Sequence, residues 1–97
     1  MKLRDAVDKV RSKNAGPFWL TIDIFCGDAD RFSRATRVHT TAFAEALGVE
    51  TQLIRRFDMP ELNVIKLSLP RPTVQGSAAD RDMHGASFAV LIAEMEI

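Results

Sequence analysis

The segment FWLTIDIF, residues 18–25, constrains the fold more than any other part of the sequence. Its residues alternate between two faces of an extended strand, with Phe18, Leu20, Ile22 and Ile24 on one face and Trp19, Thr21, Asp23 and Phe25 on the other. The first face is entirely apolar, whereas the second mixes aromatic and polar residues. We therefore expect a β-sheet that buries one face against helices.

The segment before this strand has helical spacing. Its apolar residues fall at positions i, i+3, i+4 and i+7, namely Leu3, Ala6, Val7 and Val10. Gly16 and Pro17 are typical of a helix end, which predicts a helix that ends near Asn14. In its last turn, Arg11 and Lys13 would complement the negative end of the helix dipole.

The middle of the chain predicts a helical region followed by a hairpin. Apolar residues recur at helical spacing between a candidate N-cap at Asp28 and a terminating Gly48, and the threonine-rich stretch 36–41 is expected to divide this region into two helices. Segments 52–57 and 62–69 flank the turn sequence DMPE and are expected to pair as antiparallel strands.

The C-terminal segment is ambiguous between two structures. Leu91, Ala93, Met95 and Ile97 alternate with Glu94 and Glu96, which favours a last strand over 90–97, although SFAVLIAEME also fits a helix. With the strand interpretation, the fold class is α+β, a ferredoxin-like two-layer sandwich in which a four-stranded antiparallel sheet is joined by an added N-terminal helix. The 97 residues form one domain, 1–97, because no length remains for a second core.

Composition excludes several classes of function. Lys plus Arg and Asp plus Glu each number 13, so no basic stripe favours nucleic-acid binding. Neither a signal peptide nor a membrane-spanning segment is evident, and we expect a cytoplasmic protein. Cys26 is the only cysteine, so it cannot form an intrachain disulfide, and His39 and His84 lie far apart in sequence. We expect no metal site and no cofactor.

The mixed face of the predicted sheet has two interpretations. Trp19 and Phe25, together with Asp23, Lys66 and Ser68, lie on it, and the expected last strand would add Glu94 and Glu96. An antiparallel sheet can leave such a face in water. Exposed aromatic residues are also what protein interfaces select, which makes Trp19 and Phe25 candidates for a partner interface.

Two polar clusters are candidates for chemistry. In the first, Arg11, Lys13 and Asn14 have the groups that bind a carboxylate or phosphate, but taken alone they are better explained as the end of a helix. The second lies in the loop GSAADRDMHG, where Asp80, Asp82 and His84 are candidate acid–base residues and Arg81 is a candidate substrate-binding cation. The alternative is that Asp80 caps a helical turn while Arg81 and Asp82 form a weak surface ion pair.

Three stretches together resemble a known family: LRDAVDKVRSKNAGPFWLTIDIFC, LPRP and GSAADRDMHGA. They are similar to the small bacterial family known as domain of unknown function 4387, whose members are encoded beside, or fused to, large proteins of the acyclic-terpene-utilisation (AtuA-like) type. The similarity extends over nearly the whole chain. The resemblance implies a ferredoxin-like domain that works with an AtuA-like large subunit in carboxylate or acyl-thioester catabolism, in a hydratase or lyase.

The resemblance also implies which residues form the site. It adds Arg71 to Arg11, Lys13, Asn14 and Arg81 as binders of an anionic substrate, gathered at one rim of the sheet. We expect an accessory subunit that completes such a site, with a homo-oligomer left open. A purely structural or regulatory interaction module is the alternative, and a stand-alone enzyme comes third.

Overall fold

A computed structural model describes residues 1–71 and 87–97 of the chain. The helical elements are α1 (Leu3–Ala6), α2 (Ala29–Ala35), α3 (Thr40–Leu47), the short 3₁₀ helix η1 (Thr51–Leu53) and α4 (Phe88–Ala93). The strands are β1 (Lys9–Asn14), β2 (Trp19–Phe25), β3 (Arg55–Met59) and β4 (Val64–Pro70). None of the helices in the described ranges is long and apolar enough to cross a membrane.

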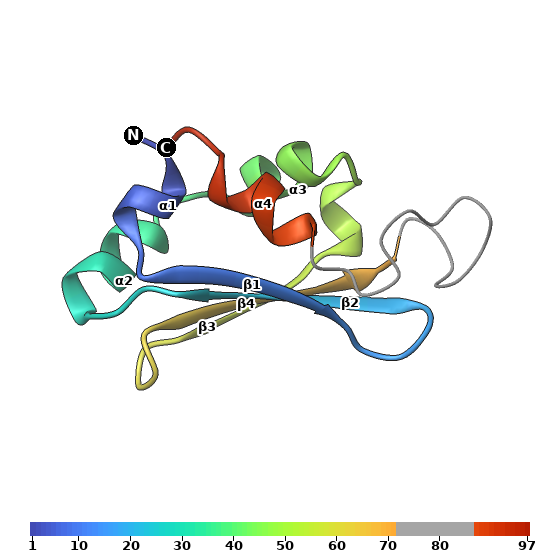
Figure 1. The fold of residues 1–97 in the computed structure, drawn as a ribbon, viewed down its shortest axis with the longest axis horizontal. Coiled ribbons are helices and arrows are strands. Elements are labelled where there is room, and N and C mark those ends of the chain that lie inside the picture. Colours follow the sequence, from blue (N-terminus) through green and yellow to red (C-terminus); the bar gives the residue numbers. More distant parts are fainter. Residues whose placement is uncertain (72–86) are drawn as a thin grey trace.

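The strands form one antiparallel sheet in the order β1-β2-β4-β3. The helices all lie on the same side of this sheet, and the opposite face has no layer of described chain over it (Figure 1). The expected α+β class and the four-stranded antiparallel sheet are therefore confirmed. We call the uncovered side the open face.

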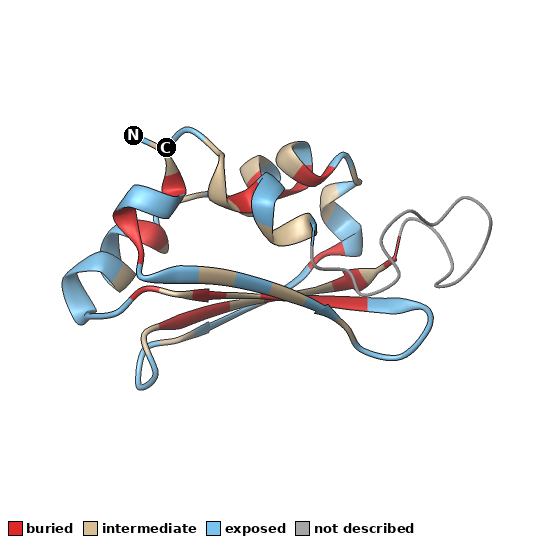
Figure 2. Cartoon of the chain, in the orientation of Figure 1, coloured by how far each residue is buried: buried red, intermediate tan, exposed pale blue. Residues whose placement is uncertain are grey.

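The hydrophobic core lies between the sheet and the helices (Figure 2). The two central strands bury every second residue on the helical side of the sheet, and helices α1, α3 and α4 pack further apolar side chains against them. The sheet contributes Leu20, Ile22, Ile24, Ile65, Leu67 and Leu69, and the helices contribute Leu3, Phe43 and Ile92. The alternation expected for segment 18–25 is thus confirmed for β2. Phe18, which was expected to continue it, lies in the preceding loop and is exposed.

The helical end points and the hairpin were also largely predictable. The Asp28 side chain accepts a hydrogen bond from the Arg31 backbone N–H (2.8 Å), and Gly48 ends α3 in the left-handed conformation with φ of 69°. The threonine-rich stretch does separate α2 from α3. The second hairpin forms as expected, although its first strand starts at Arg55 and the residues just before it form η1.

The predicted N-terminal helix is wrong beyond its first turn. Helix α1 ends at Ala6, and Lys9–Asn14 forms strand β1, which pairs with β2 from Lys9–Phe25 to Asn14–Leu20. Gly16 takes its positive φ of 85° in the hairpin loop, where the Ala15 N–H donates to the Trp19 carbonyl (2.9 Å). A short isolated helix is marginal, whereas pairing with β2 satisfies the backbone groups of this edge strand that point toward β2.

The predicted last strand is wrong as well. The segment forms helix α4, which buries Ile92 against the core while Leu91 faces solvent. The place beside β2 is already taken by β1, so α4 packs over β1 in the helical layer (Figure 1). Glu94 and Glu96 therefore lie near α1 and not on the open face: Glu94 pairs with Lys2 and Arg4, and Glu96 forms a β-bridge with Lys2.

These two corrections change the element order. The described chain runs β-β-α-α-β-β-α after α1, with a 3₁₀ turn before the second hairpin, and not in the β-α-β-β-α-β order of a ferredoxin-like sandwich. The edge strand beside β2 is therefore β1, which precedes β2 in the chain, and not a strand from the C-terminal segment. Along this edge, the side chains of the open face consequently come from β1.

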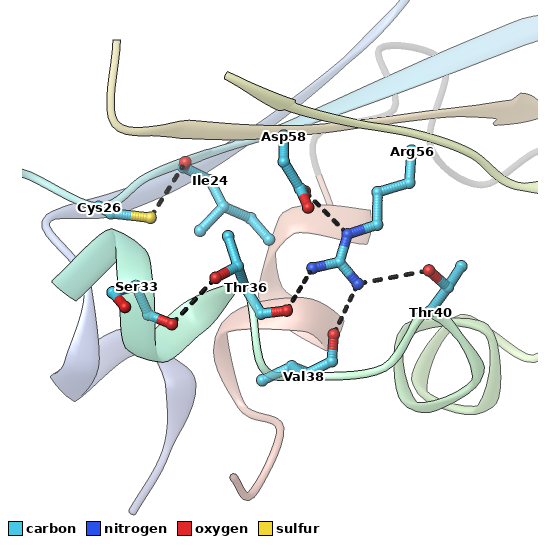
Figure 3. A network of polar contacts seen from close by, with 8 residues as sticks. All are labelled: Ile24, Cys26, Ser33, Thr36, Val38, Thr40, Arg56 and Asp58. Carbon is cyan, nitrogen blue, oxygen red and sulfur yellow. Dashed lines mark hydrogen bonds and ion pairs between the residues drawn. The ribbon is translucent and has the colours of Figure 1, made fainter. Parts of the chain in front are cut away.

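Arg56 fastens β3 to the connection between α2 and α3 (Figure 3). Its guanidinium donates to the carbonyl oxygens of Val38 (2.6 Å) and Thr36 (3.0 Å) and to the Thr40 hydroxyl (3.3 Å). The Nε–H donates to Asp58 (2.9 Å). These bonds satisfy carbonyl oxygens beyond the end of α2, which have no partner within that helix. The arginine is therefore a structural clamp on the helical side of β3.

Candidate functional site

The open face is formed by every second residue of the four strands. Cross-strand partners share one face of a sheet, so the pairing identifies its members. They are Lys9, Arg11 and Lys13 from β1, Trp19, Thr21, Asp23 and Phe25 from β2, Val64, Lys66, Ser68 and Pro70 from β4, and Arg55, Phe57 and Met59 from β3.

The pairing arranges these side chains in rows that cross the sheet. One row runs Lys13–Thr21–Ser68–Arg55, and we call it the hydroxyl row. The next row runs Arg11–Asp23–Lys66–Phe57, and the one after it runs Lys9–Phe25–Val64–Met59. Neighbouring strands are about 4.8 Å apart, so adjacent side chains of a row lie close enough to contact the same ligand group.

Positive charge dominates this face. Its cations are Lys9, Arg11, Lys13, Arg55 and Lys66, whereas its single carboxylate is Asp23. Within residues 1–71 and 87–97, none of these five cations forms an ion pair. The chain as a whole has no net charge. The open face is therefore a local basic surface on a neutral protein.

Aromatic side chains lie between these charges. Trp19 is 40% exposed and Phe57 is 49% exposed, while Phe25 is partly buried. The Arg55 guanidinium lies 5.8 Å from the Trp19 ring centroid, and the Lys9 ammonium lies 5.0 Å from that of Phe25. Such cation–π contacts place charge directly over apolar surface.

Thr21 is the unusual residue of the open face. The residue is only 9% exposed, and its hydroxyl has no hydrogen-bond partner in the part of the chain that the structure describes. Buried hydroxyls are nearly always hydrogen-bonded, because an unpaired one loses its bonds to water without replacement. Together with Ser68 and Lys66, Thr21 lines a shallow hollow of about 730 Å³ over β3 and β4.

The structure separates the predicted substrate-binding residues into two groups. Arg11 and Lys13 alternate with Ser12 and Asn14 along β1, so the two cations lie on the open face and the two smaller residues on the helical side. Arg11 and Lys13 line a second cavity of about 180 Å³ with Asp23. These cations therefore belong to a strand, and the expected helix end does not exist.

Asn14 and Arg71 do come together, on the helical side. The Arg71 guanidinium donates to the Asn14 side-chain oxygen and lies 6.0 Å from the Phe88 ring centroid, and Arg71 is 8% exposed. Nearby, the Ser12 hydroxyl accepts a hydrogen bond from the Ala89 N–H (2.8 Å). Asn14 and Arg71 therefore lie together on the helical side, whereas Arg11 and Lys13, expected at the same rim, lie on the open face.

The remaining candidates for chemistry are the residues of the loop GSAADRDMHG, the histidines and Cys26. Asp80, Arg81, Asp82 and His84 lie outside the described residues. His39 is the exposed residue before α3, and in the described ranges no three histidine, cysteine, aspartate or glutamate side chains converge on a metal position. Burial, followed by the negative charges of Asp28 and Asp58, raises the pKa of the Cys26 thiol to about 11. At neutral pH this thiol is protonated and hence a poor nucleophile.

Part of the open face was missed in the sequence. Lys9 was assigned to a helix, and no face was assigned to Arg55 and Phe57. The signal for the last two was present, because Arg55, Phe57 and Met59 alternate with Arg56 and Asp58. The contact of Arg55 with the Trp19 ring depends on sheet order, which no local pattern encodes.

Comparison with known proteins gives one positive result. The search of curated proteins and the search of solved structures each find no match. A family model described as "Domain of unknown function (DUF4387)" matches residues 3–96. This match covers the sheet, the helical layer and the segment between β4 and α4, so the chain belongs to the DUF4387 family.

Proposed function

We propose that this protein is a small accessory subunit that docks through its open face onto an AtuA-like large subunit. The single observation that carries the docking step is the uncovered sheet face with its exposed Trp19 and Phe57. Aromatic and arginine side chains are enriched at protein interfaces. The resemblance of the sequence to proteins encoded beside AtuA-like ones supplies the identity of the partner.

The large subunit would carry out the reaction, as a hydratase or lyase acting on a branched carboxylate or acyl-thioester. The small subunit would complete the anionic-substrate site with the loop that contains Asp80, Arg81, Asp82 and His84, which follows the buried Arg71. Arg71, the last described residue before that loop, donates to the Asn14 side chain and lies against the Phe88 ring. A cytoplasmic location would accompany such catabolic work.

Co-expression with the neighbouring AtuA-like gene product tests the docking step. The co-purified complex is sized by light scattering after gel filtration, for the wild type and for two matched variants. Phe57→Glu places a charge on the open face, and Leu91→Glu does so on the helical side at a position of similar exposure, 46%. We expect the first variant to prevent the complex and the second to retain it. Equal behaviour of the two variants would contradict docking through this face.

Arg81→Gln separates the accessory role from a purely structural one. The reconstituted pair is assayed for hydration or lyase activity on a panel of branched carboxylates and their thioesters. A shared site predicts loss of turnover with the complex intact. Unchanged turnover would leave a structural or regulatory module, which is the second candidate and is favoured by the same exposed Trp19 and Phe57.

A further inference from the structure

We propose that the hydroxyl row Lys13–Thr21–Ser68–Arg55 binds an acidic side chain, Asp or Glu, of the docked protein partner. This inference rests on the proposed docking through the open face. Beyond docking itself, the inference specifies which groups the partner's surface must present: carboxylates in addition to apolar groups. The hydroxyl row would then be the polar centre of the interface.

The composition of the hydroxyl row matches a carboxylate. A carboxylate accepts up to about four hydrogen bonds through its two oxygens. Thr21 and Ser68 are direct cross-strand partners and place two hydroxyl donors side by side, and Lys13 and Arg55 add a cation at each end. Lys66 lies one row away and lines the same hollow as the two hydroxyls. Hydrogen bonds to a charged acceptor are about twice as strong as neutral ones.

The buried hydroxyl of Thr21 is a second, independent argument that the hydroxyl row binds an acceptor. Its hydroxyl is buried without a partner among the described residues although it borders a hollow at the surface. A threonine kept for strand packing alone would be better replaced by valine, which has the same shape and no polar group to satisfy. Docking would have to move aside the side chains that cover this hydroxyl, and an oxygen acceptor of the partner would then complete its hydrogen bonding.

Charge complementarity favours an acidic partner over a neutral one. The open face has five cations and one carboxylate, and its described cations lack ion pairs, so a partner rich in Asp and Glu would neutralise it. Opposed patches of this kind steer association and fix its register.

Single-stranded nucleic acid fits this face less well. Binding there requires free aromatic ring faces on which bases stack. Arg55 lies over Trp19 and Lys9 over Phe25, so these two rings already carry a cation. The centre of the hydroxyl row contains no aromatic residue.

The test is an NMR titration of the isolated full chain at low ionic strength with three probes: hexaglutamate, a uridine decamer and acetate. We expect hexaglutamate to shift the backbone amides of Thr21 and Ser68 and those of the two adjoining strands. Thr21→Val should weaken this binding roughly tenfold, because one hydrogen bond to a charged group is lost. The control Thr41→Val, on the opposite side of the molecule in α3, should bind as the wild type does.

Other outcomes would overturn the inference. Equal binding by the two threonine variants would mean that the hydroxyl row is not used. Tighter binding of the uridine decamer, with the largest shifts at Trp19 and Phe25, would identify a nucleic-acid surface. Acetate binding as strong as that of hexaglutamate would indicate a pocket for small carboxylates. Failure of the hydroxyl row with an intact co-expressed complex would refute this inference alone, whereas hexaglutamate binding without any complex would refute only the docking proposal.

Discussion

At the scale of single residues, Thr21 shows how a binding surface can lower the stability of the free protein. Thr21→Val removes an unpaired buried hydroxyl and keeps the side-chain shape, so we expect it to stabilise the isolated chain by about 1 kcal/mol. In a domain of this size, that corresponds to a rise in Tm of about 4–8 °C. Thermal unfolding followed by circular dichroism would measure the change.

A second threonine provides the control for this prediction. The Thr40 hydroxyl accepts a hydrogen bond from Arg56, so Thr40→Val should lower the Tm. If both substitutions shifted the Tm in the same direction, the unpaired state of the Thr21 hydroxyl would not be the cause.

Arg55 and Arg56 are neighbours in β3 with different roles: Arg56 is a structural clamp, whereas Arg55 lies on the open face. Arg56→Lys keeps the charge, but an ammonium cannot reproduce the forked bonds to Thr36, Val38 and Asp58, so we expect a loss of roughly 1–3 kcal/mol. Arg55→Lys, on the open face, should change the free energy of unfolding by less than about 0.5 kcal/mol. Urea denaturation of the two variants tests this difference, and equal losses would refute the assignment of Arg56 as the clamp.

At the scale of elements, the helices and strands that could be predicted are those whose form depends on residues close together in the sequence. The alternation in β2, the cap at Asp28 and the left-handed glycine at Gly48 all depend on neighbours within a few residues. The segment 9–14 was different, because Val10 points inward both in a helix and in a strand. The four polar residues that follow it, RSKN, suit an exposed helix end as well as an edge strand with cations on one side.

The same limit explains the C-terminal segment and the candidate site. A short apolar run such as FAVLIA fits either a strand or a helix, and the choice depends on whether the sheet edge beside β2 is still free. Because β1 occupies that edge, Arg11 and Lys13 lie on the open face, whereas Asn14 contacts Arg71 on the helical side. Chemical type thus singled out Arg11, Lys13 and Trp19 of the open face but not Lys9, Arg55 and Phe57, and the grouping of all of them required the sheet order.

The contact between α1 and α4 has a pH dependence of known sign. A hydrogen bond from Lys2 (2.5 Å), followed by the nearby Arg4 and Lys2 charges, lowers the pKa of Glu94 from its ordinary 4.5, although partial desolvation opposes this. The ionised carboxylate therefore stabilises the fold above pH 4.5, and its contribution disappears as the pH falls through the lowered pKa.

Glu94→Gln tests this dependence. We expect a small loss of stability near neutral pH, since the pair is solvent-exposed, and no difference from the wild type at an acid pH below the lowered pKa of Glu94. Urea unfolding at the two pH values measures it, with Glu61→Gln in the β3–β4 turn as the control. A loss that persisted unchanged in acid would show that the charge of Glu94 is not responsible.

At the scale of the whole molecule, a two-layer fold with one uncovered basic face must avoid pairing with itself. In a symmetric dimer through the open face, the five cations of one copy would oppose those of the other, with only Asp23 to offset them in each. Like-charge juxtaposition across an interface disfavours association. Salt screens exposed charges over about 10 Å at 0.1 M, so it should relieve this repulsion.

Salt should therefore act in opposite directions on the two kinds of association. We expect the isolated chain to sediment as a monomer at low salt and to begin to self-associate near 0.5 M salt, where Trp19 and Phe57 can meet with the charges screened. The complex with an acidic partner should instead weaken as salt rises, because screening removes its attraction. Sedimentation velocity over a salt series measures both, with Phe57→Glu as the variant that should abolish the self-association. A homodimer that is tightest at low salt would mean that copies of this chain meet through another surface and that the open face is left for a different protein.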